Sequence, residues 1–219
     1  RRAGLSGCQK PPYEKNKMAD YLHEDPEDHG VIKPVVYWRR KISVLTPFTN
    51  GPVRFGGPLP RATIEGGEKI HSALTFKTAG VSIFDGIGVE SLPFVFPFRH
   101  DGGSIEYGIT SAGGIVDLKV EPPEPDDEWP YPNYPGAFDE AYYQCSEPQA
   151  IGKEEEMRLL HQEPWFNHDR DVIVILPSSA ADPSLPNHIW NYPDDEPSVQ
   201  CLFILDTYSM KVSAFNDVD

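Results

Sequence analysis

Short runs of β-branched and aromatic residues, separated by glycine or proline, are the feature that most limits the folds open to this chain. Between residues 35 and 120 these runs recur at a spacing of roughly 8–12 residues. Such spacing is typical of an antiparallel sandwich or barrel. We expect strands at 35–38, 41–45, 70–76, 81–84, 92–98, 104–109 and 115–120.

Turn-forming residues separate these runs. Residues 46–60 are rich in proline and glycine, and we expect a loop there. Asp101-Gly102-Gly103 stands between two of the expected strands, and glycine readily adopts the positive φ that tight turns need. This segment therefore predicts a hairpin that joins the strands at 92–98 and 104–109.

Charge and glycine content both change near residue 120. Residues 1–120 carry 15 Lys and Arg against 13 Asp and Glu, and they hold 16 of the 18 glycines. Residues 121–219 carry 4 against 21, a net charge of −17. We therefore expect a mainly β protein, with a glycine-rich antiparallel β domain at 35–120 and a smaller acidic α+β region at 136–219. Whether the two pack as one unit is left open.

The acidic region holds the main helical patterns of the sequence. Apolar residues from Phe138 to Cys145 fall at i, i+3, i+4 and i+7, which predicts an amphipathic helix. A second helix is expected between about 146 and 161. Residues 171–177 and 200–206 predict buried strands, antiparallel or non-adjacent because no helix connects them. Residues 210–215 predict an edge strand.

Two segments that disfavour regular structure flank the glycine-rich domain. Residues 1–34 predict an extended N-terminal arm. Residues 121–135 contain six prolines, which remove backbone donors and predict a stiff seam rather than a helix or a central strand. Aromatic side chains in the seam are expected to pack on this chain or on another one, and this makes them candidate interaction residues: Trp129, Tyr131 and Tyr134.

Composition excludes several classes of protein. No stretch approaches the roughly 18 apolar residues of a membrane span. No glycine-rich phosphate loop and no nucleophile elbow occurs, so we expect no cofactor. A net charge of −17 disfavours nucleic acid as a partner of the acidic half. The three cysteines, Cys8, Cys145 and Cys201, form no metal-binding pair and favour a reducing, soluble compartment or an assembled particle over secretion.

Residues 161–171 are the best candidate for chemistry. Two histidines and three carboxylates lie within eleven residues. A metal would use His161, His168 and Asp171 as ligands. General acid–base catalysis would use His161, Glu163, His168 and Asp169. The alternative, which we prefer, is a loop whose side chains cap backbone groups and whose Arg170 pairs with a neighbouring aspartate.

A short basic run contrasts with the acidic half. Arg39, Arg40 and Lys41 are too few for a nucleic-acid footprint. We interpret Arg39 and Arg40 as candidate interaction residues. We also expect these cations, with Arg54, to lie near carboxylates of the acidic half, within the chain or across a subunit boundary.

These features lead us to expect a non-catalytic structural or assembly subunit of a larger complex, with other protein subunits as partners. The charge asymmetry, the proline-rich segments and the start at Arg1, typical of a processed product, motivate this hypothesis. A viral or phage particle protein and a subunit of an organellar complex both fit. Two alternatives remain open. One is a metal-dependent or His/carboxylate hydrolase that uses residues 161–171, and the other is an acidic binding or inhibitor module.

Overall fold

Strands dominate the computed structural model, which describes residues 21–22, 31–58, 70–98, 103–121, 136–160, 166–178, 182, 185 and 200–217. Within these ranges lie one short α-helix, α1 (Lys153–Leu159), and two 3₁₀ turns at Thr78–Gly80 and Ser82–Phe84. The strands are β1 (Val35–Trp38), β2 (Lys41–Pro47), β3 (Val53–Phe55), β4 (His71–Lys77), β5 (Ser91–Phe96), β6 (Ser104–Ile109), β7 (Ile115–Glu121), β8 (Ala141–Cys145), β9 (Gln149–Ala150), β10 (Asp171–Pro177), β11 (Gln200–Asp206) and β12 (Lys211–Asp217).

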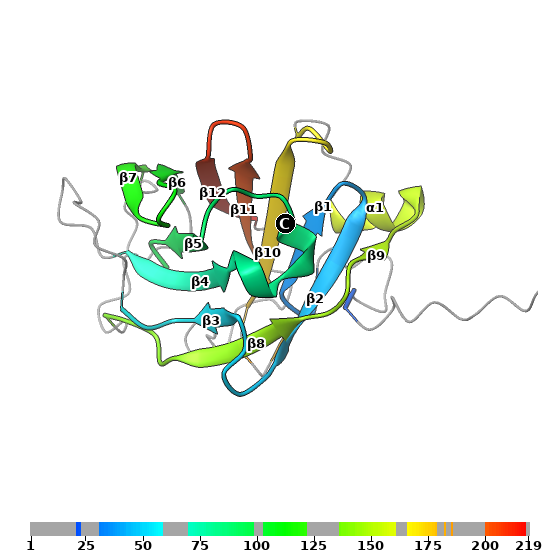
Figure 1. Cartoon of the computed structure of the whole chain (residues 1–219), viewed down its shortest axis with the longest axis horizontal. Helices are drawn as coiled ribbons and strands as arrows, with labels where there is room; N and C mark the ends of the chain where they lie inside the picture. The colour runs from blue at the N-terminus through cyan, green and yellow to red at the C-terminus, as the bar shows by residue number, and fades with distance from the viewer. Residues whose placement is uncertain are drawn as a thin grey trace, which may run out of the picture.

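All twelve strands belong to one antiparallel sheet that curls into a nearly closed barrel (Figure 1). The strand order is β5-β4-β3-β8-β2-β1-β10-β11-β12-β6-β7, and β9 pairs with β2. The mainly β prediction is therefore confirmed. A separate acidic α+β region is not shown, because β8 lies between β3 and β2 while β10 pairs with β1. Strands from both charge halves share one hydrogen-bonded ladder.

Several strands form where the sequence predicts them. The elements at 35–38, 104–109, 171–177 and 200–206 have the predicted bounds. The last two pair antiparallel, with Asp171 opposite Asp206. The predicted strand at 210–215 forms as β12, but it is not an edge strand, since it pairs with β11 on one side and with β6 on the other.

Other local predictions are wrong. The expected helix at 138–145 is strand β8, whose backbone fills the gap between β3 and β2. The expected strand at 81–84 is a 3₁₀ turn, and the expected loop at 46–60 contains β3. The predicted hairpin also fails, because β6 pairs with β12 and β7 rather than with β5. A helix does form within 146–161, as the short α1.

Two apolar clusters lie on opposite faces of the sheet. The larger one fills the barrel with aromatic side chains from β3, β4, β5 and β11, including Phe55, Phe76, Phe94 and Phe203. The smaller one lies outside the barrel, where Leu159 of α1 is buried in the same cluster as side chains of β1 and β10. Strands β1 and β10 are buried along their whole length, which explains the unbroken apolar runs at 35–38 and 172–176.

Part of the predicted N-terminal arm joins the outer cluster. Tyr21, Leu22 and Val31 are buried there, and Leu22 forms an isolated bridge with Val31. The rest of residues 1–30 and all of residues 122–135 lie outside the described residues. Cys145 and Cys201 are free thiols. Within the described ranges, no helix is long and apolar enough to span a membrane.

Candidate functional site

Three turns and helix α1 meet at one end of the sheet, which we name the turn end. Strands β1, β10 and β11 are antiparallel neighbours, so the end of β1, the start of β10 and the end of β11 lie side by side. The turn end therefore contains the β1–β2 turn, the turn that precedes β10, and the turn at 207–210 between β11 and β12. It gathers ionisable side chains from distant parts of the sequence.

The β1–β2 turn consists of two arginines in an unusual conformation. Trp38 pairs with Lys41, which leaves Arg39 and Arg40 as the two turn residues. Their φ angles are 51° and 58°, in the left-handed region. A two-residue hairpin turn of this kind normally carries Asn-Gly, because glycine adopts positive φ without strain.

Three contacts hold this turn in place. The guanidinium carbon of Arg39 lies 4.3 Å from the centre of the Trp38 ring, a cation–π geometry. The backbone carbonyl of Arg40 accepts a hydrogen bond from the Ile151 N–H at 3.1 Å. The Arg40 Nε lies 3.9 Å from Oε1 of Glu156, while 69% of the Arg40 side chain remains exposed. The two charged groups are thus presented to solvent on a fixed backbone.

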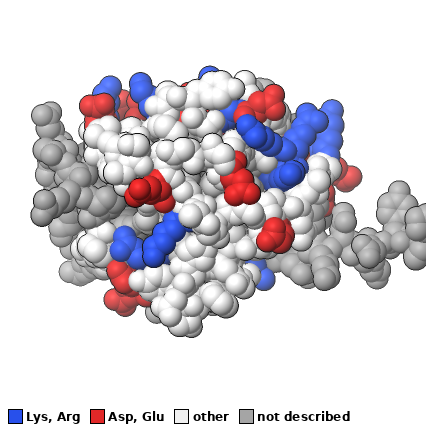
Figure 2. Space-filling view, in the orientation of Figure 1, with Lys and Arg blue, Asp and Glu red and all other residues white. Residues whose placement is uncertain are grey.

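Further cations surround this turn. Lys41 begins β2 and Lys153 begins α1, and both are exposed, as are Arg39 and Arg40. Figure 2 shows a group of Lys and Arg side chains over the region where Figure 1 places the β1–β2 turn and α1. We name these four residues the basic tip. These four cations stand beside three glutamates in the first turn of α1, Glu154, Glu155 and Glu156, on a protein whose net charge is −15.

Behind the basic tip, Tyr37, Glu156 and His168 form a polar cluster. The Tyr37 hydroxyl donates to Oε1 of Glu156 and lies 2.7 Å from Nδ1 of His168. The same Nδ1 lies 3.1 Å from Oε1 of Glu156. Because Tyr37 has one proton to donate, this network is satisfied when Nδ1 of His168 carries a proton. Burial, and then the hydrogen bond to Glu156, raise the pKa of Tyr37.

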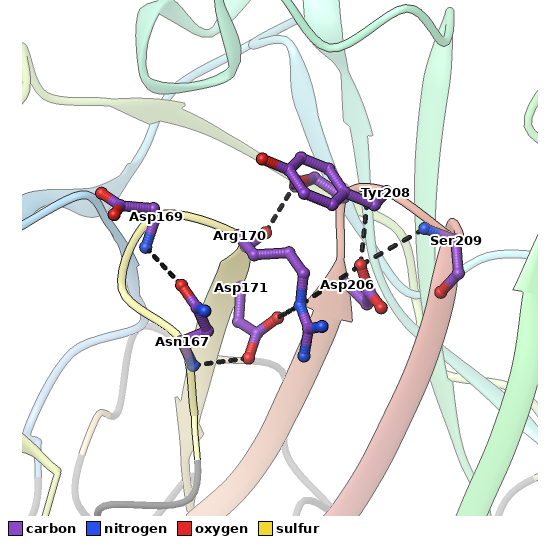
Figure 3. Close-up of polar contacts among 8 residues, drawn as sticks. Asn167, Asp169, Arg170, Asp171, Asp206, Tyr208 and Ser209 are labelled. Atoms are coloured by element: carbon purple, nitrogen blue, oxygen red, sulfur yellow. Dashed lines mark hydrogen bonds and ion pairs between the residues drawn. The ribbon is translucent and has the colours of Figure 1, made fainter.

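Arg170 links the turn before β10 to the end of β11 (Figure 3). Its Nε lies 3.0 Å from Oδ1 of the buried Asp171 and 3.6 Å from Oδ1 of Asp206. Asp171 also accepts the Asn167 N–H at 2.7 Å. The Arg170 carbonyl accepts the Thr207 N–H at 3.2 Å. These contacts are those of the capped loop that the sequence favoured, in which Arg170 pairs with Asp171.

The turn at 207–210 is organised by Asp206. Its Oδ1 accepts the backbone N–H groups of Tyr208 at 2.9 Å and Ser209 at 3.3 Å. Burial opposes ionisation of Asp206, but these hydrogen bonds and Arg170 outweigh it, so its pKa lies below the ordinary value. Tyr208 is 81% exposed. An exposed tyrosine beside arginine is a combination enriched at protein interfaces.

The structure separates the residues that the sequence grouped as candidates for chemistry. His168 contacts Glu156 and Tyr37, while Asp171 contacts Arg170 and Asn167. Asp169 is exposed, and its backbone N–H donates to Asn167. His161 and Glu163 lie outside the described residues, as do the seam aromatics Trp129, Tyr131 and Tyr134. Among the residues that are described, no three His, Cys, Asp or Glu side chains could hold a metal ion together.

Sequence reasoning missed Tyr37, Glu156, Asp206 and Tyr208. Tyr37 stands in an apolar run and Glu156 in a run of acids, so neither carries a local signal of its role. The expected proximity of cations and second-half carboxylates is confirmed within the chain for two residues. Arg40 approaches Glu156, and Arg54 lies 3.4 Å from Glu140.

Comparisons of this chain with known protein families, curated proteins and solved structures found no match.

Proposed function

We propose that this protein is a non-catalytic assembly subunit, and that its basic tip binds an acidic segment of a second copy of the chain. The Arg39–Arg40 turn is the observation that carries this proposal. Two adjacent non-glycine residues with positive φ are unfavourable by about 1 kcal/mol or more each. An Asn-Gly pair would make the same turn without that strain, so two arginines at these strained positions point to a role for their charge.

The turn is organised before any partner arrives. Trp38 holds Arg39, and Glu156 with the Ile151 N–H holds Arg40. Ordering flexible side chains opposes association, and this loss is smaller when the side chains are already positioned. Arginine also pairs with carboxylates through two parallel hydrogen bonds, which suits an acidic partner.

A second copy supplies a complementary charge. Residues 121–219 carry a net charge of −17, whereas the basic tip carries four cations. Repulsion between two chains of net charge −15 would be reduced where the basic tip of one meets acidic residues of the other. Such a contact weakens as salt screens exposed charges.

Sedimentation velocity of the full chain across a salt series tests the proposal. We expect a concentration-dependent oligomer at low salt that dissociates as salt rises. The variant Arg39→Asn with Arg40→Gly should stay monomeric, whereas Arg39→Lys with Arg40→Lys should still associate. Lys77→Gln removes an exposed cation elsewhere and should behave as the wild type. A wild type that is monomeric at all salt concentrations would overturn the proposal, as would unchanged association of the Asn-Gly variant.

One observation favours a second candidate, a His/carboxylate hydrolase. The Nδ1 edge of His168 is held by Glu156 and Tyr37, which directs Nε2 away from them, and 38% of the side chain is exposed. A histidine oriented by a carboxylate is an arrangement used in general-base catalysis. Glu156 would then be the carboxylate that orients this histidine. Hydrolysis of activated esters that is lost in His168→Gln would support this candidate, and equal rates in the two proteins would remove it.

A further inference from the structure

A hollow of about 410 Å³ lies on the outer face of the β12–β6–β7 part of the sheet. Tyr107 and Val212 of these strands are buried on the inner face. Because side chains alternate along a strand, their neighbours Glu106, Gly108 and Lys211 belong to the outer face. Gly108 also lines the hollow, and the side chain of Val116 lies close to it, since a Cβ at Gly108 would lie 3.1 Å from Cγ2 of Val116. This site is far in sequence from the basic tip and is independent of the function proposed above.

Four charged side chains surround this hollow. Lys211 stands opposite Gly108 on β12, and Asp117 belongs to β7 on the other side. Glu106 and Lys119 face each other across β6 and β7. Among the described residues, the charged groups of these four side chains form no ion pair with one another or with a neighbour. Opposite charges directly across two strands normally attract one another. Because these four charged groups form no such ion pair, they remain available to a ligand.

A β-bulge shapes the hollow. The register places Glu106 opposite Lys119 and Gly108 opposite Val116, so Asp117 and Leu118 together face the single residue Tyr107. Asp117 has a φ of 52°, in the left-handed region. Bulges redirect side chains and are frequent beside functional sites, where strained backbone is also retained.

We propose that this hollow binds a small zwitterion between an amino acid and a dipeptide in size. Lys211 lies on β12 and Asp117 on β7, two strand spacings apart, which separates their backbones by about 9–10 Å. The ligand carboxylate binds Lys211, and its ammonium group binds Asp117. Ser213, opposite Glu106, offers a hydroxyl to the same ligand.

A titration followed by amide chemical shifts of the full chain tests this site. Glycylglycine is the probe, N-acetylglycylglycine lacks its ammonium group, and glycylglycinamide lacks its carboxylate. We expect saturable shifts at Gly108 and Ser213 with glycylglycine, and affinities lower by about threefold or more for each modified ligand. No saturable shift would overturn the proposal. Equal affinity of all three ligands would also overturn it, because the hollow would then not recognise charge.

Two variants assign the charges. Asp117→Asn keeps a residue that tolerates positive φ and removes the carboxylate, so the preference for glycylglycine over its N-acetyl form should disappear. Lys211→Gln should remove the preference over the amide. Lys77→Gln, an exposed lysine on β4 outside the hollow, is the control and should leave all three affinities unchanged. Preferences that persist in both hollow variants would contradict the assignment.

Discussion

The hydroxyl of Tyr107 joins β6 to β5. It donates to the Pro93 carbonyl at 3.0 Å and accepts the Val95 N–H at 3.1 Å. Strand β5 stands at one end of the strand order and, among the described strands, pairs only with β4. Alternate residues of a strand direct their backbone groups to the same edge, so Pro93 and Val95 both face away from β4. The Tyr107 side chain therefore links β6 to β5 at the place where the described part of the barrel has no backbone ladder between neighbouring strands.

Tyr107→Phe is expected to lower the free energy of unfolding by about 2–4 kcal/mol, because it leaves two buried backbone groups without a partner. Urea denaturation followed by circular dichroism measures this change. Tyr208→Phe removes a hydroxyl from a residue that is 81% exposed and should have almost no effect. Equal effects of the two variants would show that the Tyr107 hydroxyl does not close the barrel.

Replacing the strained arginine turn should make the protein more stable. Arg39→Asn with Arg40→Gly relieves two unfavourable φ angles, and we expect a gain of about 1 kcal/mol after the loss of the Trp38 and Glu156 contacts. Arg39→Lys with Arg40→Lys keeps the strain and should not be stabilised. Thermal unfolding at high salt, where association is weak, measures both. A destabilised Asn-Gly variant would contradict the idea that the turn is strained for a role outside folding.

Asp206 should make stability depend on pH on the acid side. Its pKa is lower in the folded protein than the ordinary 3.8, so folding favours the ionised carboxylate. This contribution is present above pH 3.8 and is lost as the pH falls through the folded pKa. Asp206→Asn should be less stable than the wild type at neutral pH, and the two should converge in acid. A constant difference at every pH would show that the hydrogen bonds do not depend on charge.

Tyr37 should have the opposite dependence, on the alkaline side. Its pKa is raised above the ordinary 10.0 by burial and by Glu156, so folding favours the protonated phenol. Its contribution is complete below pH 10.0 and is lost as the pH rises through the folded value. Tyr37→Phe should therefore lose less stability than the wild type when the pH is raised above 10. Denaturant midpoints across that range measure the difference, and parallel curves would argue against the effect.

The strand predictions succeeded where local sequence and burial agree. Residues 172–176 form an unbroken apolar run rich in β-branched residues, which is the pattern expected of a strand such as β10 that is buried on both faces. The helix predicted at 138–145 failed because eight residues are too few to separate a helical stripe from coincidence. Tyr143 of that segment is buried in the barrel core, where pairing with β2 and β3 decides the backbone conformation.

The candidate site could be anticipated only in part. Arg39 and Arg40 stand out as a basic pair in the sequence, and His168 stands out among carboxylates. Their partners Trp38 and Glu156 do not stand out in the sequence. Glu156 meets His168 only because α1 and the turn before β10 reach the same end of the sheet. The positive φ of the two arginines also has no local signal, since their identity opposes it.

By itself, the sequence determined the strands at 35–38, 104–109, 171–177 and 200–206, because β propensity and apolar patterning depend on neighbouring residues. It also determined the charge asymmetry. Only the tertiary structure decided that strands from the two charge halves share one sheet, because ladder hydrogen bonds between distant segments leave no mark in local composition. The same long-range pairing decided which side chains meet at the turn end and which surround the hollow at Gly108.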